Sequence, residues 1–266
     1  MPKFAANLTM MYTELPFLDR FGAAAEAGFE AVEFQFPYAY ASDDIAERLA
    51  RHGLVAALFN LFPGDAEKGD RGFAALPGRS AEFRGSVLQA RAYATTLGVT
   101  KLHVMAGNAD RREATARAAF VDSLKFAAEM LGEAGIEALI EPINAVDFPG
   151  YFLNDFDYAS ELIHRLKLPN LKLQFDIYHR QRMRGAMFEG LRTLMPIIGH
   201  VQVASAPLRQ EPGTGELDDF RVFGELDRLG YDGYVGCEYR PAVGTAAGLG
   251  WLARARAGQD VRSSGT

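Results

Sequence analysis

The run Leu171-Lys172-Leu173-Gln174-Phe175-Asp176 is a short, mainly apolar stretch that ends in a carboxylate. Three other apolar runs in the second half of the chain end in a carboxylate or a carboxamide, at Glu141, Gln202 and Glu238. Short apolar runs bounded by polar residues are typical of buried strands. The carboxyl ends of the strands of a parallel barrel meet at one mouth, where the chemistry is done. The four runs therefore indicate parallel strands whose polar ends converge.

Eight such runs alternate with longer segments of helical periodicity. They cover residues 4–8, 31–36, 54–58, 102–105, 138–140, 171–175, 198–203 and 234–237. Eight strands alternating with helices over about 250 residues are typical of a (β/α)8 barrel. The competing doubly wound sheet usually has a glycine-rich turn after its first strand, and Asn7-Leu8-Thr9-Met10 contains no glycine. We expect an α/β fold, a single TIM barrel over residues 1–257 with a disordered tail at 258–266.

The composition is that of a soluble globular protein, with 266 residues of which 48% are hydrophobic and 23% charged. A net charge of -6 argues against a nucleic-acid-binding surface, which needs clustered Lys and Arg. Cys237 is the sole cysteine, so no internal disulfide is expected. The chain has no secretory h-region and no membrane-spanning apolar run. These features predict a cytoplasmic protein.

The polar strand ends are spaced like successive strand–helix units. From Glu141 to Asp176 to Gln202 to Glu238 the steps are 35, 26 and 36 residues, which places them on the fifth to eighth strands. Three carboxylates and one amide oxygen are hard donors that suit Mg²⁺ or Mn²⁺. Three adjacent carboxylates without a cation would repel one another. Any one of the four positions is also compatible with a helix cap, but four caps in a row explain the pattern less well than a metal site does.

Strand parity adds a second layer to this predicted site. Successive side chains of a strand point to opposite faces, so Gln174 shares a face with Asp176 and His200 shares one with Gln202. If Asp176 and Gln202 point into the mouth, Gln174 and His200 lie one layer deeper. His103 lies within a strand and is expected to be a core residue.

Other candidates for substrate binding lie near the expected mouth. His179 follows Asp176 by three residues and either contacts substrate or supports the site. Glu33 ends the second strand and either contacts substrate or caps a loop. Asn60 begins the long loop after the third strand. Arg71 of that loop and Arg209 of the loop after the seventh strand are either solvated or bind an anionic substrate.

Several of these motifs together resemble the hydroxypyruvate isomerase family, which belongs to the xylose isomerase-like barrels. They are Phe4-Ala5-Ala6-Asn7-Leu8, Gly69-Asp70-Arg71-Gly72, Leu76-Pro77-Gly78-Arg79, Ile140-Glu141-Pro142-Ile143-Asn144, Phe175-Asp176-Ile177-Tyr178-His179-Arg180-Gln181, Glu211-Pro212-Gly213-Thr214-Gly215-Glu216 and Gly236-Cys237-Glu238-Tyr239. The match extends to about residue 251. Each motif is weak alone, and the set is specific.

The resemblance implies an isomerase of glyoxylate and sugar-acid metabolism that interconverts hydroxypyruvate and 2-hydroxy-3-oxopropanoate (tartronate semialdehyde). A close branch isomerises 2-oxo-tetronates, which are one carbon longer. By the same resemblance, Glu141 and Glu238 match the proton donor and acceptor. Glu141, Asp176, Gln202 and Glu238 match the positions that bind the metal.

The chain departs from the family pattern in its loops. Ser205-Ala206 stands where some members have Asp-Asn, Leu208 where they have His, and Phe59 where a His often precedes Asn60. We expect these positions to line the mouth or its lid, where they bear on the exact substrate more than on the reaction type.

Four other functions remain open from the sequence. A ketose 3-epimerase of the same superfamily usually has His where Gln202 stands. An apurinic endonuclease-like barrel needs more histidines than the five present. A metal-free glycosidase with a Glu pair leaves Asp176 and Gln202 unexplained. A non-catalytic barrel that binds a sugar acid predicts a metal but no proton exchange into the ligand. The oligomeric state is also open, a homo-oligomer included.

Overall fold

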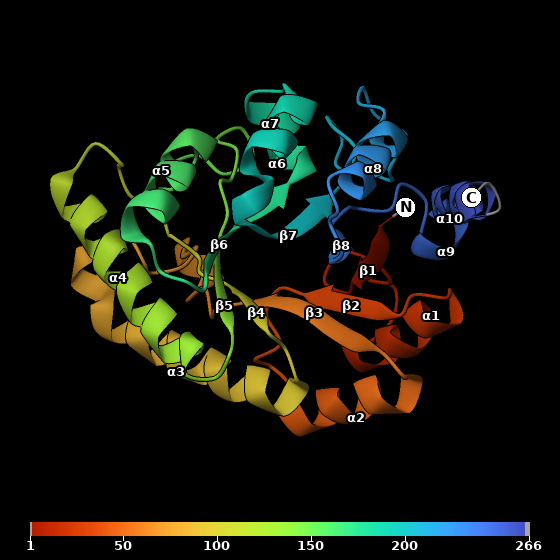
Figure 1. Cartoon of the computed structure of the whole chain (residues 1–266). Helices are drawn as coiled ribbons and strands as arrows, with labels where there is room; N and C mark the ends of the chain where they lie inside the picture. Colours follow the sequence, from red (N-terminus) through yellow and green to blue (C-terminus); the bar gives the residue numbers. More distant parts are fainter. Residues whose placement is uncertain (1, 264–266) are drawn as a thin grey trace.

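The computed structural model describes residues 2–263, with side chains as far as residue 257. Eight parallel strands form a closed barrel in the order β1-β2-β3-β4-β5-β6-β7-β8, with helices around it (Figure 1). The strands are β1 Lys3–Asn7, β2 Ala31–Phe34, β3 Val55–Asn60, β4 Lys101–His103, β5 Glu137–Ile140, β6 Leu171–Asp176, β7 Ile198–Val203 and β8 Tyr234–Cys237. The predicted single (β/α)8 TIM barrel is confirmed.

The helices form the outer layer. They are α1 Arg20–Glu26, α2 Ser42–His52, α3 Ser80–Leu97, α4 Ala114–Gly132, α5 Phe156–Leu166, α6 Ile177–Met183, α7 Met187–Leu194, α8 Asp219–Arg228, α9 Thr245–Gly248 and α10 Gly250–Ser263. Short 3₁₀ segments are η1 Phe17–Asp19, η2 Ala66–Lys68, η3 Pro77–Arg79 and η4 Met195–Ile197. Amphipathic helices such as α2 and α5 bury one apolar stripe, for example Ile45 and Leu49 of α2. Because these helices cover the strands from outside while side chains fill the barrel, both faces of the strands are buried.

The register of β6 and β7 agrees with the expected parity. Gln174 lies opposite His200, and Asp176 lies opposite Gln202. The second pair is at the carboxyl ends of the strands and the first pair is two residues deeper. Strand geometry therefore places two layers of polar side chains at and below the mouth.

The chain ends meet beside the closure of the barrel. β1 pairs with β8, and α9 and α10 lie near the start of the chain (Figure 1). The ring of Trp251 packs edge-on against Phe4, and the Arg256 guanidinium donates to the Gly28 carbonyl. The predicted tail at 258–266 begins within α10; residues 264–266 lie outside the described residues, and the tail stays a prediction.

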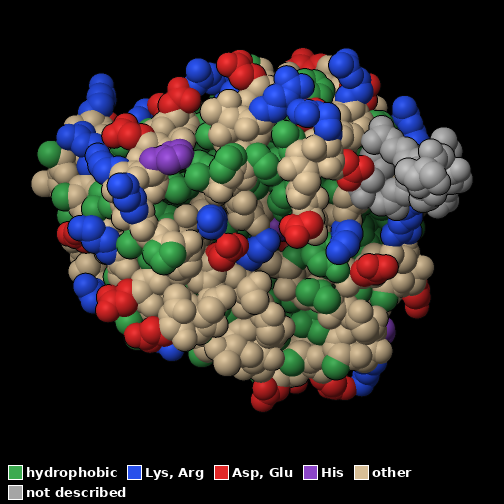
Figure 2. All heavy atoms as spheres, viewed as in Figure 1, with side chains coloured by type: hydrophobic (Ala, Val, Ile, Leu, Met, Phe, Trp, Pro, Cys, Tyr) green, Lys and Arg blue, Asp and Glu red, His purple; other side chains and the backbone are tan. Residues whose placement is uncertain are grey.

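Charged side chains of both signs are interspersed with apolar ones over the face shown in Figure 2. Among the described residues, no helix has the length and apolar character needed to cross a bilayer.

Glu225 of α8 binds two arginines, one on its own helix and one on α7. Its carboxylate accepts hydrogen bonds from Arg228 on α8 at 2.7 and 2.8 Å and from Arg192 on α7 at 2.6 Å. These hydrogen bonds lower the pKa of Glu225 from 4.5 to about 2. A carboxyl whose pKa is lower in the folded state stabilises the fold above its unfolded pKa and loses that effect as pH falls through the folded value.

We expect Glu225→Gln to lower the melting temperature at pH 6 and the difference from wild type to narrow steadily from pH 4.5 towards pH 2. Thermal unfolding followed by circular dichroism across this range measures it. A difference that stays constant with pH would mean that the ionised carboxylate does not stabilise the fold.

Candidate active site

A cavity of 280 Å³ opens at the carboxyl ends of the strands. The predicted residues that line it are Asn60, Arg71, Glu141, His179, Arg209 and Glu238. Asp176 and Gln202 do not line it; both are buried, at 0% and 1% exposure, on the strand ends immediately around it. The structure thus brings all four predicted metal-binding residues to one end of the barrel.

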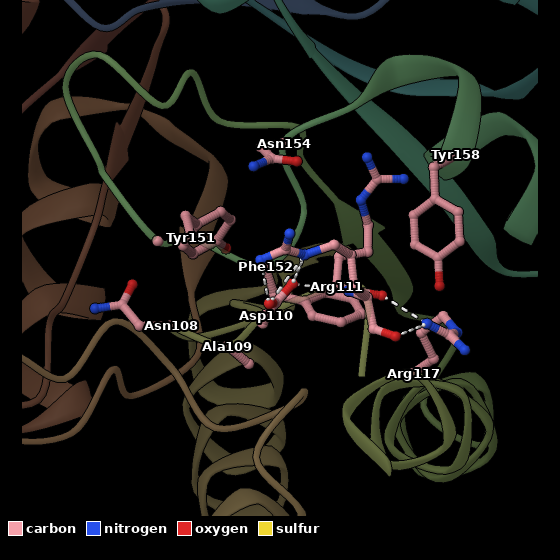
Figure 3. A pocket seen from close by; sticks show the side chains of 11 residues that line it. Asn108, Ala109, Asp110, Arg111, Arg117, Tyr151, Phe152, Asn154 and Tyr158 are labelled. Atoms are coloured by element: carbon pink, nitrogen blue, oxygen red, sulfur yellow. Dashed lines mark hydrogen bonds and ion pairs between the residues drawn. The ribbon is translucent and has the colours of Figure 1, made fainter. Parts of the chain in front are cut away.

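A larger hollow of 920 Å³ lies outside the mouth, between the start of α4 and the segment before α5 (Figure 3). Each of its arginines already has a hydrogen-bond partner. Arg112 forms paired hydrogen bonds with Asp110, Arg117 donates to two backbone carbonyls, and Arg111 donates to Asp155. Because these cations are already partnered, the smaller cavity with its convergent carboxylates is the better candidate for chemistry.

The mouth concentrates negative charge around one guanidinium. Arg209 Nη2 lies 2.5 Å from Glu238 Oε2 and 3.6 Å from Asp176 Oδ2. Its guanidinium stacks 4.9 Å from the centre of the Tyr178 ring. The Arg209 backbone has φ of 55°, which is uncommon for a residue with a side chain.

Burial and mutual repulsion act on the three carboxyl groups. Burial raises the pKa of Glu141 well above its ordinary value, and the charges of Glu238 and Asp176 raise it further. Burial also raises the pKa of Asp176 to about 7 and raises that of Glu238, while Arg209 opposes both shifts. If all three carboxylates are ionised, they and the one guanidinium together carry a net charge of two negative units. One divalent cation would balance that charge.

Two buried oxygens in this group have no hydrogen-bond partner. They are Glu141 Oε1 and Asp176 Oδ2. Unsatisfied buried oxygens are rare in native proteins, and their presence here calls for a partner such as an ion. Oxygen donors, an unbalanced charge and two unpartnered atoms all fit a hard divalent metal ion. Glu141, Asp176 and His179 also place donor atoms within 4.8 Å of one another.

The hydrogen bonds of His179 decide whether its ring can bind a cation. Asn144 Oδ1 accepts from the backbone N–H groups of Val146 and Asp147, so the Asn144 amide nitrogen must point elsewhere. That nitrogen lies 2.7 Å from His179 Nδ1, and the Asn144 backbone N–H also points to Nδ1. His179 Nδ1 is therefore an acceptor.

Burial lowers the pKa of His179 well below its ordinary value, so the ring is neutral and its single proton lies on Nε2. This Nε2–H lies 3.6 Å from Asp176 Oδ2 and 3.8 Å from Glu141 Oε1. A protonated nitrogen is a donor and not a metal ligand. The tautomer favours His179 as a hydrogen-bond donor into the site, which leaves the amide of Gln202 as the fourth candidate ligand.

Glu33 does not lie where a substrate contact would. It is absent from the cavity wall and has 0% exposure. Its carboxylate binds Asn7, His200 and Gln202 below the mouth. Because Glu33 lies in the deeper layer of the barrel, its prediction as a substrate-binding residue is not supported by the geometry.

The family departures also lie away from the cavity. Phe59 is buried against Phe34, and Ser205 bonds to Asp219 and to the Gly213 N–H inside its own loop. Ala206 is buried and Leu208 is 70% exposed. None of Phe59, Ser205, Ala206 and Leu208 lines the cavity wall. The expectation that they line the mouth or its lid, and so bear on the exact substrate, stays a prediction.

Sequence reasoning missed Gln35 and Arg240, which line the cavity. Gln35 Nε2 donates to Glu238 Oε1 at 2.8 Å. Gln35 directly follows β2 and lies two residues after Glu33, so the alternation of side chains along the strand could have predicted that it faces the same side. Arg240 lies three residues beyond the end of β8, where the chain is irregular and that alternation no longer applies.

The chain belongs to the xylose isomerase-like TIM barrel family, whose model matches residues 21–255. It is 51% identical to the 2-oxo-tetronate isomerase of Cupriavidus necator over 95% of this chain and 98% of that one. It is 43% identical to the hydroxypyruvate isomerase of Escherichia coli, with the same coverage. These relatives confirm the resemblance found in the sequence.

Solved structures agree on the fold. The structure of a protein described as AP endonuclease, family 2, from Brucella melitensis superposes with a TM-score of 0.93 at 44% identity, covering 96% of this chain and 99% of that one. A 3-keto-D-glucoside 4-epimerase from E. coli superposes with a TM-score of 0.77 at 21% identity, covering 96% and 99%. At that identity the likeness concerns the fold alone.

We expect His179 to remain neutral, with its proton on Nε2, from pH 5 to pH 8, because Asn144 donates to Nδ1 and burial disfavours the cation. Long-range ¹H–¹⁵N correlation spectra of the imidazole distinguish the two tautomers and the imidazolium. Exposed His164 on α5 is the internal control. A His179 ring that carries its proton on Nδ1 would contradict this assignment.

Proposed function

We propose that this chain is an aldose–ketose type isomerase, an intramolecular oxidoreductase that interconverts hydroxypyruvate and 2-hydroxy-3-oxopropanoate. The observation that carries the proposal is the pair Glu141 and Glu238. Both carboxyl groups are buried, have raised pKa values and line one cavity from strand ends on different sides of the barrel. Two such groups suit proton removal and delivery near neutral pH.

The reaction moves a carbonyl group by one carbon. A proton leaves the hydroxymethyl carbon C3 and a proton is delivered to C2, while the hydroxyl proton on O3 is transferred to O2, so the substrate passes through an enediolate. One glutamate accepts the first proton while the other delivers the second, and the two exchange roles with the direction of reaction. Gln35 and Arg209, which both bind Glu238, fix the position of that carboxylate.

Glu141, Asp176, Gln202 and Glu238 would hold the divalent metal, Mg²⁺ or Mn²⁺. When bound, the metal supplies Lewis-acid stabilisation of negative charge on neighbouring substrate oxygens. Support for this ligand set comes from the two unpartnered oxygens, the charge of the cluster and the donor role of His179.

Substrate recognition falls to cationic and donor groups of the same cavity. Arg71 and Arg209 would bind the substrate carboxylate, since guanidinium groups pair with carboxylates in a fixed geometry. His179 would donate its Nε2–H to a substrate oxygen. Asn60 lines the wall from the end of β3. Three further points stay predictions: that the protein binds no nucleic acid, that it binds no membrane, and that it is cytoplasmic. Its oligomeric state stays open, a homo-oligomer included.

A 2-oxo-tetronate is the second candidate substrate, because the 51% identical relative carries that name. The same two glutamates would act on it. A ketose 3-epimerase is less well supported, because Gln202 stands where those enzymes usually have His. An endonuclease with several zinc ions is also less well supported: His52 and His164 lie on outer helices and His200 lies below the mouth, which leaves His103 and His179 beside the cavity.

The test is isomerisation of hydroxypyruvate by the purified protein with and without EDTA, coupled to an NADH-linked reductase of the product. We expect turnover that EDTA abolishes and Mn²⁺ or Mg²⁺ restores. Glu141→Gln should lower kcat about 100- to 10,000-fold, the usual contribution of a general acid or base. Glu137→Gln, at the opposite end of β5, is the matched control.

Near-normal turnover of Glu141→Gln would overturn the assignment of the catalytic pair. Turnover of a 2-oxo-tetronate but not of hydroxypyruvate would move the proposal to the longer substrate. Binding of either acid to the metal-loaded protein, without exchange of substrate hydrogen into D₂O, would identify a non-catalytic barrel.

Arg71 provides a separate test of carboxylate recognition. Its guanidinium lies 5.9 Å from the Phe148 ring and has no acidic partner among the described residues. Loss of a hydrogen bond to a charged group costs about 1.5–3 kcal/mol, so Arg71→Ala should raise KM about 10- to 100-fold with a smaller change in kcat. Arg84→Ala on α3 is the control. An unchanged KM would assign the carboxylate to Arg209 or Arg240.

A further inference from the structure

A buried carboxylate below the mouth connects three side chains from two strands. Glu33 is the last residue but one of β2, and its carboxylate accepts hydrogen bonds at 2.8 Å from Asn7 Nδ2 on β1 and from His200 Nε2 and Gln202 Nε2 on β7. The side chain has 0% exposure, and each of its two oxygens has at least one protein donor. It is not free to bind substrate.

The direction of each hydrogen bond follows from the backbone. Asn7 Oδ1 accepts from the N–H groups of Thr9 and Met10, at 3.1 and 3.3 Å. The Asn7 amide nitrogen therefore faces Glu33, and Glu33 Oε1 must be an acceptor. Backbone donors at the start of the β1–α1 loop thus fix the polarity of the contact.

The same acceptor fixes the amide of Gln202. Gln202 contacts the oxygen Oε1 of Glu33 that Asn7 also contacts, so it must present its NH₂ group there. Its own carbonyl oxygen is then turned away from Glu33 and towards β6, where Gln174 Nε2 donates to it at 2.7 Å. β6 also carries Asp176, which lies opposite Gln202 in the register. One lone pair of that oxygen remains.

The barrel leaves space for the Glu33 carboxylate at one position of the neighbouring strand. A Cβ atom built on Gly236 of β8 would lie 2.0 Å from Glu33 Oε2. Gly236 is also the register partner of Gln202. Any side chain at residue 236 would displace the carboxylate that holds Gln202.

We propose that Glu33 is a positioning residue, whose carboxylate orients the Gln202 carboxamide with its oxygen available to the carboxylate cluster and its NH₂ group turned away. The inference rests on the proposed function, because the oxygen matters only if the cluster binds a cation. Without Glu33, the Gln202 carboxamide loses the acceptor that fixes the position of its NH₂ group. An NH₂ group turned towards a cation would repel it.

The experiment is a double-mutant cycle read by Mn²⁺ binding, measured by electron paramagnetic resonance of free Mn²⁺ and by calorimetry. The proteins are wild type, Glu33→Gln, Gln202→Ala and the double variant. We expect Glu33→Gln to weaken Mn²⁺ binding about 10- to 100-fold, as for other residues that orient metal ligands. In the Gln202→Ala background the same change should have no further effect, because the cycle isolates coupling between the two residues.

Glu225→Gln, which removes a carboxylate from the α7–α8 contact, is the matched control and should bind Mn²⁺ as wild type does. Equal weakening by Glu33→Gln in both backgrounds, or no weakening in either, would overturn the positioning role. Failure of wild type itself to bind Mn²⁺ would overturn the proposed metal site, a result distinct from the other two. Neutron diffraction of the wild-type protein needs no variant to fold, and a Gln202 oxygen found facing Glu33 would also overturn the inference.

Discussion

Repulsion among three carboxyl groups buried at the ends of β5, β6 and β8 is the constraint on which the arrangement of the mouth depends. Burial alone raises the pKa of each of these groups, and their neighbours raise some of them further. The guanidinium of Arg209 opposes that repulsion through its ion pairs with Glu238 and Asp176. One cation of charge +1 does not balance three carboxylates, and the remaining imbalance is the physical reason to expect a divalent metal.

The polar residues of the mouth come from two kinds of segment, strand ends and loops. The carboxylates and the amide of Gln202 come from strand ends, where the closed barrel fixes their separation. The arginines at the mouth come from the loops after β3 and β7 and the segment after β8. In the proposed function, the chemistry that needs fixed geometry is carried by the strand ends, while recognition of the substrate's anionic end is carried by loop segments, which tolerate sequence change. This division is consistent with relatives that bear the names of two different substrates.

Much of this arrangement was predictable from sequence because hydrophobic periodicity and strand parity are strong signals. The strands over 198–203 and 234–237 have the predicted bounds, and Gln174 and His200 lie in the deeper layer. Short helices were missed: α6 and α7 have seven and eight residues, too few to show a helical period. Asp110 and Glu113 have the spacing of a capping box, yet α4 begins at Ala114, and Asp110 Oδ1 accepts from the backbone N–H of Arg112. Contacts between residues far apart in the sequence, such as Glu33 with Gln202 and Asn144 with His179, cannot be predicted from local sequence patterns.

The close approach of Gly236 to Glu33 has an evolutionary consequence. Glutamate at residue 33 requires glycine at residue 236, while glycine alone tolerates other neighbours, so the order in which the two residues change during divergence is constrained. A descendant that acquires a side chain at residue 236 would lose the proposed support of Gln202 while keeping both glutamates of the proposed catalytic pair. Homologues with intact glutamates and a larger residue at this position are therefore the place to look for barrels of this family that have given up the reaction.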